Sequence, residues 1–97
     1  FVRYASNPLI AMREIRLSEH LRSKLKILAE RNIMVSEEQI ADIVHFPNKI
    51  ELLGEGKKIA QKGWNDSLVL RVVYREFGAF CLVITVYPGK RSRYEEN

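Results

Sequence analysis

The sequence lacks the features that define several large classes of protein. It holds a single cysteine, Cys81, so no internal disulfide can form and the chain is compatible with a reducing cytosol. No apolar run approaches the roughly 20 residues needed to span a bilayer, and no signal-peptide pattern is visible. These absences predict a cytoplasmic protein without a membrane partner.

Motifs for metals and nucleotides are missing as well. One Cys and two distant His residues provide no zinc-like spacing, and the acidic residues form no paired-carboxylate motif. The stretch Gly54-Glu55-Gly56-Lys57 lacks the preceding residues of a phosphate-binding P-loop. We therefore expect no metal and no cofactor.

What is present is an ordinary globular composition with an uneven charge. The 97 residues are 46% apolar and 29% charged, which is enough for one domain with a modest core. Residues 54–94 contain eight basic and three acidic side chains, whereas residues 1–53 contain eight and seven. This excess predicts an anionic partner, such as RNA, DNA or an acidic protein segment, although a basic surface also serves solubility alone.

The first eleven residues show no clear period and no methionine. Met12 fits a natural start, with residues 1–11 either added for expression or belonging to an upstream extension. We expect residues 12–97 to form a single domain.

Local patterns predict one strand and two helices in the first half. Arg13–Leu17 alternates as in a short strand, and Ser18 then suits the N-cap of a helix that ends near Asn32, a residue able to adopt the left-handed conformation. Ser36–Gln39 forms a capping box, and Pro47 stops the second helix. The short connection predicts an antiparallel helix pair.

The sequence after Pro47 predicts strands joined by short turns. They cover Lys49–Leu53, Lys57–Lys62, Ser67–Glu76 and Phe80–Tyr87. With no room for crossover helices between them, the sheet should be antiparallel. The predicted class is therefore α+β, with an N-terminal strand and a two-helix hairpin packed on one face of a four- to five-stranded antiparallel sheet.

Alternation along the last two strands separates two faces. The apolar set expected to meet the helices is Leu68, Leu70, Val72, Tyr74, Phe80, Leu82, Ile84 and Val86. The opposite set, expected on a face open to solvent or a ligand, is Val69, Arg71, Val73, Arg75, Cys81, Val83, Thr85 and Tyr87. Its Arg, Thr and Tyr side chains suit an anion, or simply pack across strands.

The closing hairpin and the segment after it resemble the C-terminal half of RelE/ParE-type toxins. The matching segments are Leu70–Glu76, Val83–Pro88 and Lys90–Tyr94. Those toxins carry an arginine in the penultimate strand, a hydrophobic last strand and a basic segment that closes with an aromatic residue. The resemblance implies a RelE/ParE-like fold over residues 13–94.

A second resemblance lies nearer the N-terminus. Ser18–Leu21, Arg31–Ile33 and Phe46-Pro47 look like a family of small uncharacterised prokaryotic domains. These domains are grouped with the wider barnase–colicin–RelE-like ribonuclease fold.

The RelE/ParE resemblance implies a toxin of a toxin–antitoxin system that cleaves mRNA without a metal, often on the ribosome. Arg71 and Arg91 would then stabilise the negative charge at the phosphate, and Tyr94 would stack on a base or transfer a proton. His20 is an alternative acid or base because an imidazole can both accept and donate a proton, although an exposed helix residue fits it as well.

The remaining basic and aromatic positions are predicted to contact nucleic acid. They are Lys57, Lys58, Lys62, Arg75, Tyr87, Lys90 and Arg93. RelE-type toxins carry functional lysines on the strand that holds the first three. Two other hypotheses remain open: a non-catalytic module that binds RNA or an acidic protein, and a structural domain that dimerises through an open sheet edge. We expect a monomer or a weak dimer, with a cognate antitoxin as protein partner.

Overall fold

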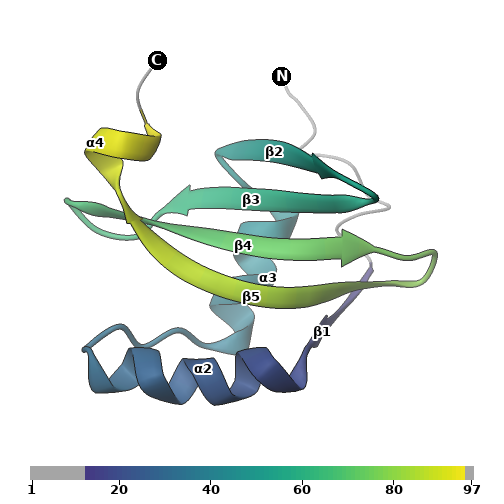
Figure 1. Ribbon diagram of the computed structural model, residues 1–97, viewed down its shortest axis with the longest axis horizontal. Helices are drawn as coiled ribbons and strands as arrows, with labels where there is room; N and C mark the ends of the chain where they lie inside the picture. The colour runs from purple at the N-terminus through teal and green to yellow at the C-terminus, as the bar shows by residue number, and fades with distance from the viewer. Residues whose placement is uncertain (1–12, 96–97) are drawn as a thin grey trace.

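The computed structural model describes residues 13–95 (Figure 1). Its elements are β1 (Glu14–Leu17), α2 (Glu19–Glu30), α3 (Glu37–His45), β2 (Lys49–Gly54), β3 (Lys57–Gly63), β4 (Leu68–Glu76), β5 (Phe80–Lys90) and α4 (Arg91–Tyr94). The order strand, helix, helix and four strands is as predicted, whereas β5 runs past Tyr87 and the short helix α4 was not predicted. The predicted extension, residues 1–11, lies outside the described residues.

The helix ends are formed by the local signals that the sequence contains. Ser18 caps α2 by accepting a hydrogen bond from the Leu21 backbone N–H at 3.1 Å. After α2 the chain turns at Asn32, whose φ of 66° is in the left-handed region. The capping box between Ser36 and Gln39 begins α3 with both of its hydrogen bonds formed.

The five strands form one mixed sheet in the order β1-β5-β4-β3-β2. Strands β2 to β5 are an antiparallel meander, as predicted. The prediction of a wholly antiparallel sheet is wrong for β1, which pairs parallel to β5. Short connections force only consecutive strands to be antiparallel. The chain between β1 and β5 is long enough to return in either direction.

The two long helices lie against the sheet separately and do not form the predicted antiparallel pair. Helix α2 contacts β5, while α3 contacts β3 and β4. In Figure 1, α2 runs horizontally below the strands, whereas α3 rises at a steep angle to it behind the sheet. The core that they enclose comprises Leu17, Leu21, Ile40, Ile43, Val44, Ala60, Leu70, Val72, Tyr74, Cys81, Val83 and Val86. We call this side of the sheet the helix face.

A β-bulge in β5 changes which residues meet the helices. Val73 lies opposite Thr85 but Tyr74 lies opposite Val83, so Ile84 has no partner on β4. The extra residue reverses the alternation of the preceding part of the strand. The predicted faces of that part are therefore wrong: buried Cys81 and Val83 belong to the helix-side core, whereas Phe80 and Leu82 are only partly buried.

Candidate functional site

Arg71 stands at the centre of the opposite side of the sheet, which carries Gln61, Arg71 and Tyr87 and which we call the open face. Its side chain is only 3% exposed. The guanidinium donates from Nε to Tyr87 Oη at 2.9 Å, donates from Nη1 to Gln61 Oε1, and forms an ion pair through Nη2 with Glu51 Oε1 at 3.1 Å. Three strands thus supply its partners, which is how a buried cation is kept satisfied.

The charge pair in this cluster holds both partners in their ionised forms. The hydrogen bond from Arg71 lowers the pKa of Glu51 and outweighs the desolvation that would raise it. Burial by itself would lower the pKa of Arg71, but the hydrogen bonds to Glu51 and Tyr87 raise it. The cluster is therefore a compensated ion pair at ordinary pH.

Tyr94 covers this cluster from the C-terminal segment. Its ring centroid lies 4.1 Å from Arg71 Cζ, which is a cation–π contact. The Tyr94 carbonyl accepts hydrogen bonds from Gln61 Nε2 at 3.2 Å and from Lys49 Nζ at 3.3 Å. The ring also packs onto Gly89 so closely that a Cβ there would clash with it. In this arrangement a phosphate reaches Arg71 only after Tyr94 moves aside.

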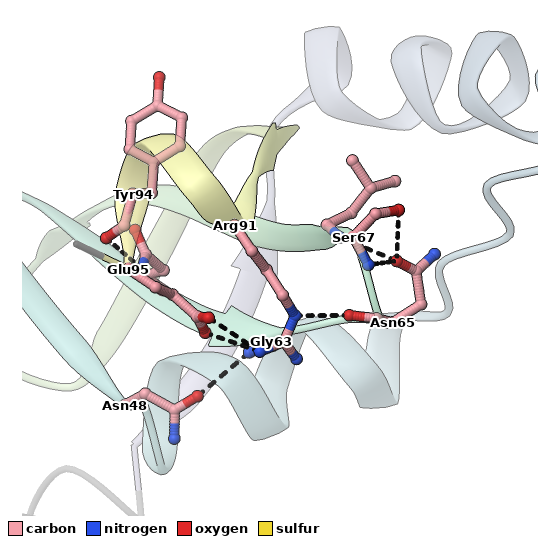
Figure 2. Close-up of polar contacts among 9 residues, drawn as sticks. Asn48, Gly63, Asn65, Ser67, Arg91, Tyr94 and Glu95 are labelled. Carbon is pink, nitrogen blue, oxygen red and sulfur yellow. Dashed lines mark hydrogen bonds and ion pairs between the residues drawn. The ribbon is translucent and has the colours of Figure 1, made fainter.

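Arg91 holds the C-terminal segment to the turn between β3 and β4, as Figure 2 shows. Its Nε donates to the Asn65 carbonyl at 2.6 Å, and its Nη1 contacts both carboxylate oxygens of Glu95 at 2.8 and 3.0 Å. The guanidinium lies directly on Gly63, where a Cβ would clash. Arg71 and Arg91, the two cations predicted to act together, share no bonding partner.

Asn65 organises this turn, and the sequence analysis did not single it out. Its Oδ1 accepts hydrogen bonds from the backbone N–H groups of Ser67 at 2.9 Å and Leu68 at 2.8 Å (Figure 2). The sequence does hold a signal for this role, since an Asn in Gly63–Ser67 is typical of side-chain-stabilised turns. This turn presents the Asn65 carbonyl to which Arg91 donates.

The lysines predicted on β3 divide between the two faces. Lys58 and Lys62 lie beside helix-face residues of β4 and are ion-paired, with Glu76 at 3.1 Å and with Asp42 of α3 at 2.7 Å. Lys57 lies on the other side of β3, opposite Arg75.

Four of the predicted nucleic-acid-binding cations have no carboxylate partner within residues 13–95. They are Lys57, Arg75, Lys90 and Arg93. Arg75 Nε is in addition buried without a hydrogen-bond partner. Lys90 and Arg93 are exposed. Tyr87, also in the predicted set, is already bonded to Arg71.

His20 lies away from this cluster, on the exposed surface of α2. It borders an open hollow of about 360 Å³ that it forms with Ser23, Lys24 and Ile27. No contact within residues 13–95 joins it to Arg71, Arg91 or Tyr94. The four predicted catalytic residues thus fall into three places: Arg71 with Tyr94, Arg91 at the turn, and His20 on α2.

Glu51 and Gln61 are the site residues that sequence reasoning missed. Both occupy open-face positions of predicted strands: Gln61 on β3, next to the strand that carries Arg71, and Glu51 on β2, one strand further away. Alternation places each of them on one of two faces, but only the register between strands brings them to the same arginine.

Comparisons with family models, with curated proteins and with solved structures find no match for this chain. The described residues contain no group of three or more His, Cys, Asp or Glu side chains arranged to hold a metal ion. Within the same residues, no helix is long and apolar enough to cross a membrane. A functional proposal therefore depends on the geometry of this chain's own side chains.

Proposed function

We propose that this protein is a RelE/ParE-like module that binds single-stranded RNA along β4 and the adjoining C-terminal segment, without cutting it. The observation that carries the proposal is the set of four cations without carboxylate partners. Every other basic residue of β3, β4 and α4 is engaged in an ion pair, so at this part of the sheet these four are the charges left to meet an anion.

The four cations lie toward the two ends of β4. Arg75 and Lys57 face each other on the open face near its C-terminal end, whereas Lys90 lies opposite Leu68 at its start, at a helix-face position at the end of the sheet. Seven residue steps of extended strand separate Arg75 from Leu68, which is about 23 Å. Tyr94 and Tyr87 lie between the two ends and offer aromatic surface. Separated cations with aromatic rings between them suit a single strand with its bases unpaired.

A titration of fluorescently labelled single-stranded RNA at several salt concentrations tests this proposal. We expect Lys57→Ala/Arg75→Ala and Lys90→Ala/Arg93→Ala each to weaken binding about tenfold. The slope of log affinity against log salt should also fall by about 1.4 in each, since two phosphate contacts are lost. The matched control is Lys26→Ala/Arg31→Ala, which removes two exposed charges from α2 and its end.

The control decides whether binding is localised. If Lys26→Ala/Arg31→Ala weakens binding as much as the other two pairs do, the attraction is a general effect of net charge and the assigned surface is wrong. A wild-type protein that binds no RNA at low salt removes the proposal altogether.

A second function is favoured by one specific cluster: a metal-independent ribonuclease toxin neutralised by an antitoxin. Glu51 and Tyr94 each contact the guanidinium of Arg71. RNA cleavage needs a base for the ribose 2′-hydroxyl, a cation at the phosphate and an acid for the departing 5′-oxygen. Carboxylate, guanidinium and phenol are side chains of those three kinds, provided that Tyr94 swings away from Arg71 to admit the phosphate.

This second function is tested by incubating RNA with the protein in the presence of a metal chelator. Cleavage should leave a cyclic phosphate end, and it should be lost in Glu51→Gln and Tyr94→Phe, which remove a base and a phenol with little change in shape. Expression in a host cell should then arrest growth. If the wild-type protein leaves the RNA intact, the ribonuclease function is excluded and RNA binding without cleavage is the proposal that stands.

A further inference from the structure

We propose that the outer edge of β2 pairs with β2 of a second copy of this chain, in one particular antiparallel register. Strand β2 is the last strand of the sheet, and no strand within residues 13–95 pairs with its outer edge. Figure 1 shows it as the strand farthest from α2. An edge of six residues with unpaired backbone groups is a template for another strand.

The side chains of β2 are unusually apolar for an exposed edge. Leu52 is 76% exposed, Leu53 50% and Ile50 36%. Ile50 and Leu52 lie on the helix face, opposite Ala60 and Lys58 of β3, while α3 contacts β3 and β4. Phe46, which ends α3 just before β2, is a further exposed apolar side chain. A strand added beside β2 would cover this apolar stripe.

The charges on β2 select a second copy as the occupant. Lys49 and Glu51 stand two residues apart on the open face, where they lie 3.7 Å from each other within one chain and Glu51 also pairs with Arg71, while Ile50 between them points to the helix face. When two copies pair antiparallel with Ile50 opposite Ile50, each Lys49 lies opposite the Glu51 of the other copy. Two opposite-charge pairs then flank one apolar pair, and each contributes to sheet stability.

Neighbouring registers do not offer this match. A pairing centred on Glu51 sets the two carboxylates directly against each other, and one centred on Lys49 does the same with the ammonium groups, which is destabilising. A pairing centred on Leu52 sets Glu51 opposite Leu53, carries Lys49 past the end of the partner's strand, and includes the irregularity between Leu52 and Gly54. The sequence of β2 is thus complementary to itself in one register.

The other edge of the sheet is less suited to pairing. Strand β1 has only four residues, and two of them, Glu14 and Arg16, are charged. Short strands and charges are common protections of sheet edges. The β2 interface is itself small, so we expect a weak dimer that forms at roughly tens to hundreds of micromolar protein.

Sedimentation equilibrium across that concentration range is the first test. The mass should rise from that of the 11.3 kDa chain towards twice that value. Ile50→Lys should abolish the rise because it places two ammonium groups opposite each other across the pairing axis. Ile27→Lys, on exposed α2, is the matched control and should dimerise as the wild type does. A monomer at every concentration, or a dimer that Ile50→Lys leaves unchanged, overturns the proposal.

Cysteine cross-linking tests the register and does not depend on Ile50→Lys being folded. The buried native thiol is first removed by Cys81→Ala, and that background carries Ile50→Cys, Glu51→Cys or Leu52→Cys in turn. Only the residue on the two-fold axis meets itself, at the Cα separation that a disulfide requires. We expect rapid oxidation to a covalent dimer for Ile50→Cys alone. Faster cross-linking at Glu51 or Leu52, or none at any position, overturns it.

Discussion

The two faces of β4 bury their side chains in different ways. On the helix face, Leu70, Val72 and Tyr74 are fully buried in an apolar core. On the open face, Arg71 is almost as deeply buried, but among a carboxylate, an amide and two phenols. Neighbouring residues of one strand are thus similarly buried, but those on the helix face are stabilised by hydrophobic contacts and Arg71 is stabilised by polar partners.

The contrast teaches where each face is vulnerable. Apolar burial is non-directional and is shared among many contacts, so its loss scales with the volume removed. The polar cluster depends on particular donors and acceptors, and the removal of one member takes a partner away from each of the others. Variants on the two faces should therefore differ both in size of effect and in how effects combine.

The largest effect is expected on the helix face, from Tyr74→Ala. Removal of a fully buried aromatic side chain should lower the free energy of unfolding by about 3–5 kcal/mol, as judged by urea denaturation. Tyr74→Phe is the control, because it keeps the ring and should lose far less. A loss below about 1 kcal/mol in Tyr74→Ala would contradict the packing of this core.

On the open face, Arg71→Met should lower the free energy of unfolding by about 1–3 kcal/mol, because Glu51, Gln61 and Tyr87 each lose a donor. The decisive measurement is a double-mutant cycle with Glu51→Gln. The loss in the double variant should be smaller than the sum of the two single losses. Strict additivity would mean that the two side chains do not interact in solution.

The attachment of α4 should have a smaller effect. Arg91→Ala removes the hydrogen bond to the Asn65 carbonyl and should cost about 0.5–1.5 kcal/mol. Backbone amides of the 64–68 turn and of residues 91–95 should then exchange with deuterium faster than in the wild type. Unchanged exchange in both segments would show that Arg91 does not hold them together, and exchange across β4 serves as the internal control.

The smallest effect concerns pH and again reports on the open face. The folded protein lowers the pKa of Glu51 below its ordinary value of 4.5, so the stabilisation is present above that value and is lost as the pH falls through the lower, folded pKa. Glu51→Gln should therefore lose less stability than the wild type over this acidic window. The side chain is 37% exposed, so solvent and salt screen the difference, which should shrink further in high salt. If the free energy of unfolding of the two proteins falls in parallel as the pH is lowered, the Glu51–Arg71 pair makes no such contribution.

Much of the fold follows from local patterns in the sequence. Ser18, Asn32 and the Ser36–Gln39 box predict the helix ends because capping involves only residues within a turn of one another. Alternation likewise places Arg71 on the face opposite the apolar set. The direction of β1 and the bulge at Ile84 could not be read in this way, since both depend on pairing between strands that are distant in sequence or shifted in register.

The candidate site shows the same division. The sequence by itself determines the types of side chain: basic and aromatic residues in the closing hairpin and its tail, with apolar residues alternating between them. Tertiary structure decides which of those cations are free. It pairs Arg71 with Glu51, and Lys58 and Lys62 with Glu76 and Asp42. The reason is physical: charge is a property of a residue, whereas its neutralisation requires a partner within about 4 Å, and only the fold brings one there.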